Sequence, residues 1–135
     1  MALKVYEDIL AYVRRMAPVV KAISKHDPNL ARQLRRALTS AVLNTAEGAQ
    51  QRGGKGRNRF EPTRVLASSG PEGSAPSART AGTVGASRSF DDAMGSTDES
   101  RAAHQAADAL EYLVADPELI AEAVRIAKVL YKLAR

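Results

Sequence analysis

The sequence predicts an all-α fold, an antiparallel up-down four-helix bundle with a long disordered insertion between helices 2 and 3. Apolar residues recur at steps of three and four along most of the chain, as they do in amphipathic helices. Two helix-start signals, Asp27-Pro28 and Asp116-Pro117, divide this pattern, and one Gly/Pro/Ser-rich stretch interrupts it. With 135 residues, we expect one domain, residues 1–135.

The first two helices are expected over about residues 3–24 and 28–51. In the first, the three-and-four spacing of apolar residues is sustained over its whole length. The second has a clear start, because Asp27 can serve as N-cap and Pro28 suits the first helical position. Its pattern reaches Gly48, a typical helix-ending residue, or a few residues beyond.

The third and fourth helices are expected over about residues 90–114 and 117–134. The third is rich in alanine, which favours close approach between helices. The fourth starts after Asp116-Pro117, which repeats the cap-and-proline signal, and then carries apolar residues at helical spacing. Short turns between the helices complete the expected bundle.

Positive charge is concentrated in the front half of the chain. Residues 1–60 hold 12 Lys/Arg against 4 Asp/Glu, a net charge of +8, whereas residues 61–135 hold 8 against 11, a net charge of −3. This asymmetry favours an anionic partner for one face, or acidic–basic contacts between subunits. Aromatic residues make up only 4% of the chain, so contact with phosphates is expected rather than base stacking.

Seven cations are the candidate nucleic-acid-binding residues: Arg32, Arg35, Arg36, Arg52, Lys55, Arg57 and Arg59. The alternative for the arginines of the second helix is a solvated face, or salt bridges to the helix that bears Asp108 and Glu111. The glycine-flanked cations at 55–59 have exposed amides nearby that can add to anion binding. Their alternative is a flexible basic turn, since the spacing of a nucleotide-binding P-loop is missing.

Polar residues at helical spacing in the second helix, Ser40, Asn44 and Glu47, are interpreted as structural. A catalytic group is the alternative, but hydrogen bonds between helices or subunits explain the spacing better, because buried polar groups need partners. His104 and Asp108 lie one turn apart, yet no second pair completes a metal site. With no cysteine and two isolated histidines, we expect no catalytic residues, no metal, no cofactor and no enzyme activity.

The run from Gln33 to Gly48, QLRRALTSAVLNTAEG, resembles a known family. It is similar to the four-helix-bundle proteins related to the rRNA intervening-sequence proteins and to the accessory variability protein of diversity-generating retroelements. Thr45 stands where isoleucine is usual in that family. The resemblance covers residues 3–60 and about 91–133.

The resemblance implies several properties. Members of the resembled family form ring-like homopentamers, which implies a pentamer here. The 44% apolar content of the chain independently favours oligomerisation. A basic surface of the retroelement proteins contacts reverse transcriptase and nucleic acid, a role carried here to Arg35 and Arg36 and more weakly to Arg57 and Arg59. Gly95-Ser96 matches the family's Gly-Ser pair, which implies tight helix packing there.

Residues 61–89 are expected to form a low-complexity, disordered loop. They are rich in glycine, proline and serine and lack an apolar period, so they bury too little surface to offset their ordering entropy. Joining Phe60 to Asp91 restores the family pattern, and Arg-Asn-Arg-Phe at 57–60 echoes Ser-Arg-Ser-Phe at 87–90. We therefore predict an in-frame insertion, whose deletion should leave a folded and more stable protein.

Together these observations predict a non-enzymatic nucleic-acid-binding adaptor that holds structured RNA or an RNA–reverse-transcriptase complex through a basic face on an oligomeric ring. The alternatives are a protein–protein scaffold that binds an acidic protein, and a remnant protein with no present activity. The charged amino terminus does not fit a signal peptide, and no apolar run approaches the roughly 20 residues of a membrane span. We thus expect a cytoplasmic protein without membrane contact.

Overall fold

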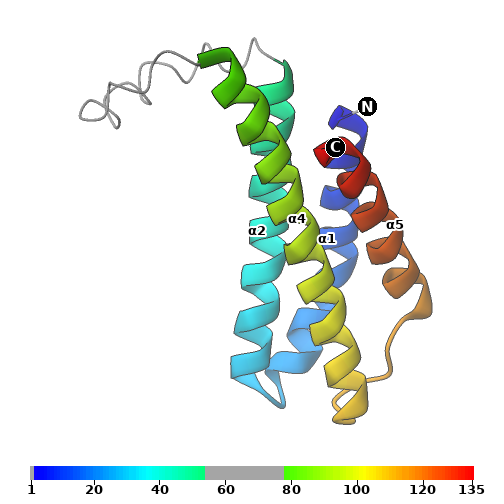
Figure 1. The fold of residues 1–135 in the computed structure, drawn as a ribbon. Helices are drawn as coiled ribbons and strands as arrows, with labels where there is room; N and C mark the ends of the chain where they lie inside the picture. The colour runs from blue at the N-terminus through cyan, green and yellow to red at the C-terminus, as the bar shows by residue number, and fades with distance from the viewer. Residues whose placement is uncertain (1, 54–77) are drawn as a thin grey trace.

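The computed structural model describes residues 2–53 and 78–135. These residues form four helices and no strand: α1 (Ala2–Ser24), α2 (Pro28–Gly53), α4 (Ala78–Ala109) and α5 (Pro117–Ala134) (Figure 1). The predicted all-α class is therefore confirmed for the described part of the chain. None of the described helices combines the length and apolarity needed to cross a membrane.

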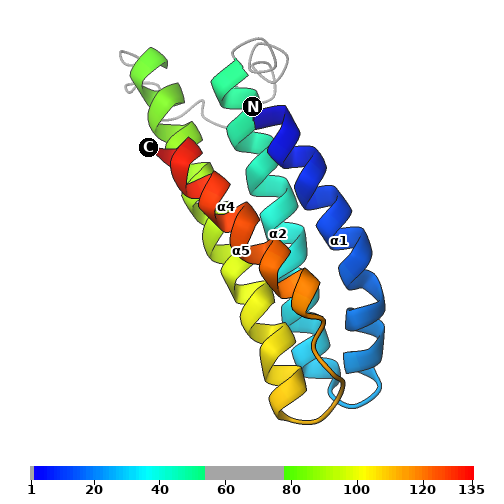
Figure 2. The same ribbon diagram turned by 90° about the vertical axis from the view of Figure 1, so that its right-hand side faces the viewer.

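The four helices share one core. The main contacts join α1 to α2, α2 to α4, α4 to α5 and α5 back to α1, so each helix packs chiefly against two others (Figures 1 and 2). Figure 2 shows the two ends of the chain near the same end of the molecule. The core is lined by one apolar face of each helix, at the spacing of three and four that the sequence displays. Its largest fully buried apolar and aromatic side chains are Val5, Ile9, Tyr12, Met16, Ile23, Leu34, Phe90, Ile126 and Leu130.

Two buried hydrogen bonds cross or line this core. The Tyr12 hydroxyl of α1 lies 2.9 Å from the Ser100 hydroxyl of α4, and Ser100 Oγ donates to the Thr97 carbonyl at 2.7 Å. Burial raises the pKa of Tyr12, so its hydroxyl stays protonated. These polar groups are satisfied within the protein, as buried groups must be.

Both proline-containing helix starts are confirmed. The backbone N–H of Leu30 donates to Asp27 Oδ1 at 3.0 Å, and that of Glu118 donates to Asp116 Oδ1 at 3.0 Å. Each bond satisfies one of the backbone donors that the first turn leaves free. These caps fix where α2 and α5 begin.

Helix α4 begins at Ala78, twelve residues before the expected start at residue 90. The prediction of a disordered loop is wrong for residues 85–89, which are helical and lie against other parts of the protein. Ala86 and Ser89 are buried, and the Ser87 hydroxyl donates to the carbonyl of Ala134 at the end of α5. Packing against α2 and α5 therefore orders a segment whose composition alone predicts a loop. The remainder of the predicted insertion, residues 61–77, lies outside the described residues.

Helix α4 also ends earlier than expected, at Ala109 rather than near residue 114. Glu111 adopts a left-handed backbone conformation with a φ of 67°. This conformation lets the N–H of Tyr112 donate to the carbonyl of Ala107 at 2.8 Å, a bond that closes the helix end. The following residues form the loop that leads to Asp116 and α5.

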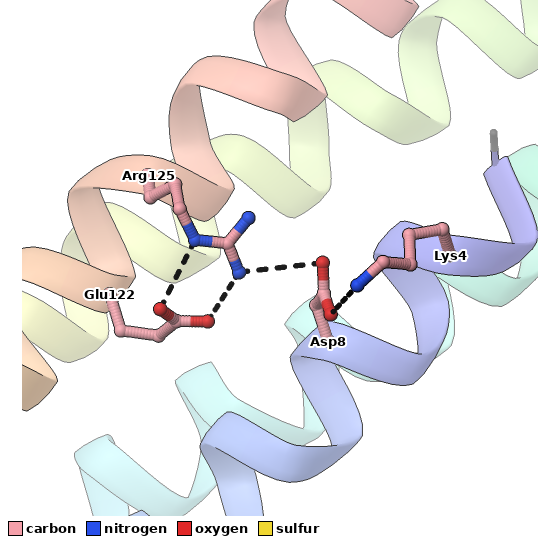
Figure 3. A network of polar contacts seen from close by, with 4 residues as sticks. All are labelled: Lys4, Asp8, Glu122 and Arg125. Atoms are coloured by element: carbon pink, nitrogen blue, oxygen red, sulfur yellow. Dashed lines mark hydrogen bonds and ion pairs between the residues drawn. The ribbon is translucent and has the colours of Figure 1, made fainter.

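A network of charged side chains joins α1 to α5 (Figure 3). Arg125 of α5 pairs with Glu122 on its own helix and lies 3.4 Å from Asp8 of α1, which also accepts a 3.1 Å bond from Lys4. Burial by itself raises the pKa of Asp8, but the hydrogen bonds and charges of Lys4 and Arg125 outweigh it, so the net pKa is lowered. The network thus favours an ionised carboxylate where α1 meets α5.

Candidate nucleic-acid interface

Three of the predicted binding residues, Arg32, Arg35 and Arg36, lie in the first half of α2, and all three are exposed. The apolar residues that precede, separate and follow them along the helix account for this orientation. Ala31, Leu34, Ala37, Leu38 and Ala41 are buried against the core, so the helical repeat turns the intervening arginines toward solvent.

The arginines border a shallow, open depression of about 650 Å³ on α2. Its lining residues are Arg32, Arg35, Arg36, Thr39, Ser40, Leu43 and Asn44. Leu43 is 62% exposed and supplies an apolar area next to the cations. Thr39 and Leu43 were not predicted as site residues, although their spacing of three and seven from Arg36 places them on the same helix face.

None of these three arginines makes an ion pair with another part of the chain that the structure describes. Arg32 donates to the neutral side chain of Asn29 at 2.8 Å. Salt bridges to Asp108 and Glu111, the alternative considered for this face, are not formed within the described ranges. The guanidinium groups are therefore open to an external anion.

Ser40 connects this face to α4. Ser96 Oγ donates to Ser40 Oγ at 2.8 Å, and Asn44 Nδ2 donates to the carbonyl and hydroxyl oxygens of Ser40 at 2.9 and 3.0 Å. This cluster joins two helices by hydrogen bonds, in line with the structural interpretation of Ser40 and Asn44. Glu47 differs, because it is exposed and accepts a 3.4 Å bond from Gln51 on the same helix.

The two glycines among the predicted structural residues differ in their surroundings. Gly48 lies inside α2, which continues to Gly53, and a Cβ atom there would be 2.7 Å from Phe90 Cε1. Gly48 therefore permits close approach of the Phe90 ring and does not end the helix. At Gly95 a Cβ atom would meet nothing within 4 Å of the described structure, so the expected tight packing is wrong for this residue.

Arg52, a fourth predicted nucleic-acid-binding residue, makes contacts within the protein. Its guanidinium donates to the carbonyl of Leu133 in the last turn of α5 and lies over the Phe90 ring, 5.7 Å from the centroid. A cation at this position satisfies a free carbonyl and complements the negative end of the helix. The other three predicted cations, Lys55, Arg57 and Arg59, lie outside the described residues.

His104 has a structural partner. Its buried Nε2 accepts a hydrogen bond from the backbone N–H of Asp116 at 3.3 Å, which supports the loop before α5. Burial lowers the pKa of His104, and the nearby carboxylates of Asp116 and Asp108 offset this only in part. The neutral imidazole is the form that can accept this bond. Residues 2–53 and 78–135 contain no cluster of three potential metal ligands.

Comparison with known proteins gave no relative: no family model, no curated protein and no solved structure matches the chain. The resemblance of the Gln33–Gly48 run therefore stays a prediction from the residues themselves.

Proposed function

We propose that this protein is a non-enzymatic adaptor that binds the phosphate backbone of structured RNA, alone or in complex with a reverse transcriptase, through Arg32, Arg35 and Arg36. The observation that carries the proposal is that these three neighbouring arginines are exposed and have no carboxylate partner within the described ranges. Guanidinium groups bind phosphate through paired, charge-assisted hydrogen bonds. Binding of this kind depends on charge and geometry and carries little base specificity.

The proposal includes an antiparallel up-down bundle that assembles into a ring-like homopentamer. The contacts of consecutive described helices, together with the α1–α5 contact, support the bundle topology. The pentamer rests on the resemblance of the Gln33–Gly48 run. In such a ring a modest three-arginine patch is repeated in each subunit, which raises avidity without new contacts.

The test is fluorescence anisotropy of a labelled hairpin RNA titrated with the protein at three salt concentrations. We expect saturable binding that weakens with salt, because each phosphate contact releases condensed counterions. The Arg35→Glu/Arg36→Glu double variant should bind much more weakly with unchanged helicity by circular dichroism. Its matched control is Arg14→Glu/Lys25→Glu, which makes the same charge change at exposed positions on α1 and in the following turn.

Equal affinity of the Arg35/Arg36 variant and the wild-type protein would exclude this face as the RNA site. An acidic protein partner is the second candidate, favoured by the exposed Leu43 beside the arginines, since protein contacts use apolar as well as charged groups. Absence of RNA binding at low salt would favour that candidate or a remnant without activity.

A further inference from the structure

A second groove lies between α4 and α5, away from the arginines of α2. Its volume is about 400 Å³, and it is lined by two stripes at helical spacing, one on each helix. Met94 and Arg101 mark the ends of the α4 stripe, and Val124 and Tyr131 lie seven residues apart on α5. Seven residues correspond to about 10 Å of helix, or two turns. Figure 1 shows α5 and α2 on different sides of α4.

The floor of this groove is apolar. Met94 and Val124 are half-buried, and Tyr131 leaves 50% of its surface exposed. Met and Tyr are frequent at protein interfaces, Met because its side chain adapts to its partner and Tyr because it offers a large, rigid contact area. Such a floor fits apolar side chains better than it fits a sugar-phosphate backbone.

The rim is cationic. Lys128 and Lys132 lie on α5 and make no ion pair within residues 2–53 and 78–135. Arg101 on α4 reaches one carboxylate, Asp98, at the long distance of 3.5 Å, and its Nε is buried without a hydrogen-bond acceptor in the described structure. Among the residues that line the groove, three cations thus accompany one carboxylate, which complements a negatively charged partner.

We propose that this groove binds an acidic amphipathic helix of a partner protein. The apolar face of that helix packs on Met94, Val124 and Tyr131, and its flanking carboxylates pair with Lys128, Lys132 and Arg101. Two adjacent helices with parallel stripes form the surface into which a third helix packs, and recognition by such grooves uses anchors at steps of three, four and seven. The site shares no residue with the arginine face of α2 and does not depend on RNA binding there.

The test uses a fluorescein-labelled peptide of about 16 residues, long enough to form a helix on binding. It carries leucines on one face and glutamates on both flanks. Two control peptides keep its length: one has lysines in place of the glutamates, and one has the same composition in an order that removes the apolar face. Anisotropy titrations with the full chain should give saturable binding of the first peptide only.

Variants then locate the site. Lys128→Glu/Lys132→Glu should weaken binding of the acidic peptide about tenfold or more and should allow the lysine-flanked peptide to bind instead. Arg14→Glu/Lys25→Glu makes the same charge change elsewhere and should leave affinity within about twofold. Circular dichroism checks that each variant is folded; both lysines have exposed side chains, so their replacement leaves the core intact.

Three results would overturn the proposal: no saturable binding of the acidic peptide, equal binding of the peptide without an apolar face, or unchanged affinity in the Lys128/Lys132 variant. The hairpin RNA could also compete with the peptide for the groove. If this competition is lost in the Lys128/Lys132 variant but kept in the Arg35/Arg36 variant, the groove is assigned to nucleic acid instead. If the protein self-associates, if this association blocks peptide binding, and if Lys128→Glu/Lys132→Glu abolishes it, the groove is assigned to a second copy of the chain.

Discussion

Replacing Gly48 with alanine tests the close contact between α2 and α4. The added Cβ would lie 2.7 Å from Phe90 Cε1 and 2.9 Å from both Cδ1 and Cζ. Carbon atoms attract each other best at about 3.5–4.0 Å, so the ring would have to move by close to 1 Å. Phe90 is fully buried, and in a close-packed core a shift of its ring displaces neighbouring side chains.

Two effects of opposite sign determine how much Gly48→Ala changes the free energy of unfolding. Alanine is favoured over glycine inside a helix by about 1 kcal/mol, which stabilises the variant. Overpacking a well-filled core costs about 1–3 kcal/mol, which destabilises it. Since the contact is with a rigid aromatic ring, we expect the second effect to prevail, with a net loss of about 1 kcal/mol in the free energy of unfolding. For a chain of this size that corresponds to about 4 °C in Tm.

Gly95→Ala is the matched control, because the same substitution at this exposed site in α4 meets no atom within 4 Å. It should stabilise the protein by up to about 1 kcal/mol through helix propensity alone. Urea and thermal unfolding, followed by far-ultraviolet circular dichroism, measure both variants. Equal stabilisation by Gly48→Ala and Gly95→Ala would refute the predicted clash with Phe90. So would a cost of Gly48→Ala that stays the same when Phe90 is first replaced by leucine.

Three further predictions concern stability. Thr45 is fully buried and its hydroxyl has no partner in the described structure, so Thr45→Val should raise the free energy of unfolding by about 1 kcal/mol; a lower Tm would contradict this. Burial lowers the pKa of His104 below its ordinary value of 6.5, so the unfolded chain takes up the proton first as pH falls. Stability should therefore be full above about pH 6.5 and decline below it, and urea unfolding at several pH values should show a smaller decline for His104→Gln. Deleting residues 61–90 should leave a cooperatively unfolding helical protein, because the deletion places Phe60 directly before Asp91, where Phe90 stands now; a broad, noncooperative transition would exclude this register.

Local signals account for what the sequence predicts well. Asp27 and Asp116 cap their helices through bonds that span two or three residues, and the apolar spacing along α1 and α5 identifies their buried faces. The exposure of Arg35 and Arg36 follows from the same periodicity. In each case the feature depends on residues a few positions apart in the sequence, so a short stretch of chain is enough to predict it.

What the sequence does not predict depends on contacts between distant residues. Arg52 reaches a carbonyl of α5 that is 81 positions away, and no local pattern distinguishes it from the other cations of the basic run. Residues 85–89 are helical, and Ser87 among them bonds to the end of α5, which composition cannot foresee. Gly48 has the residue type of a helix end, but its neighbour across the interface, Phe90, determines its role.

The salt dependence of RNA affinity tests the central proposal most directly. Each phosphate contact contributes a slope of about 0.7–0.9 to the fall of log affinity with log salt. We predict that Arg35→Glu/Arg36→Glu lowers the slope by about 1.4–1.8 per RNA-contacting subunit, whereas Arg14→Glu/Lys25→Glu leaves it unchanged. An equal slope for the wild-type protein and the Arg35/Arg36 variant would contradict phosphate binding by the arginine face of α2.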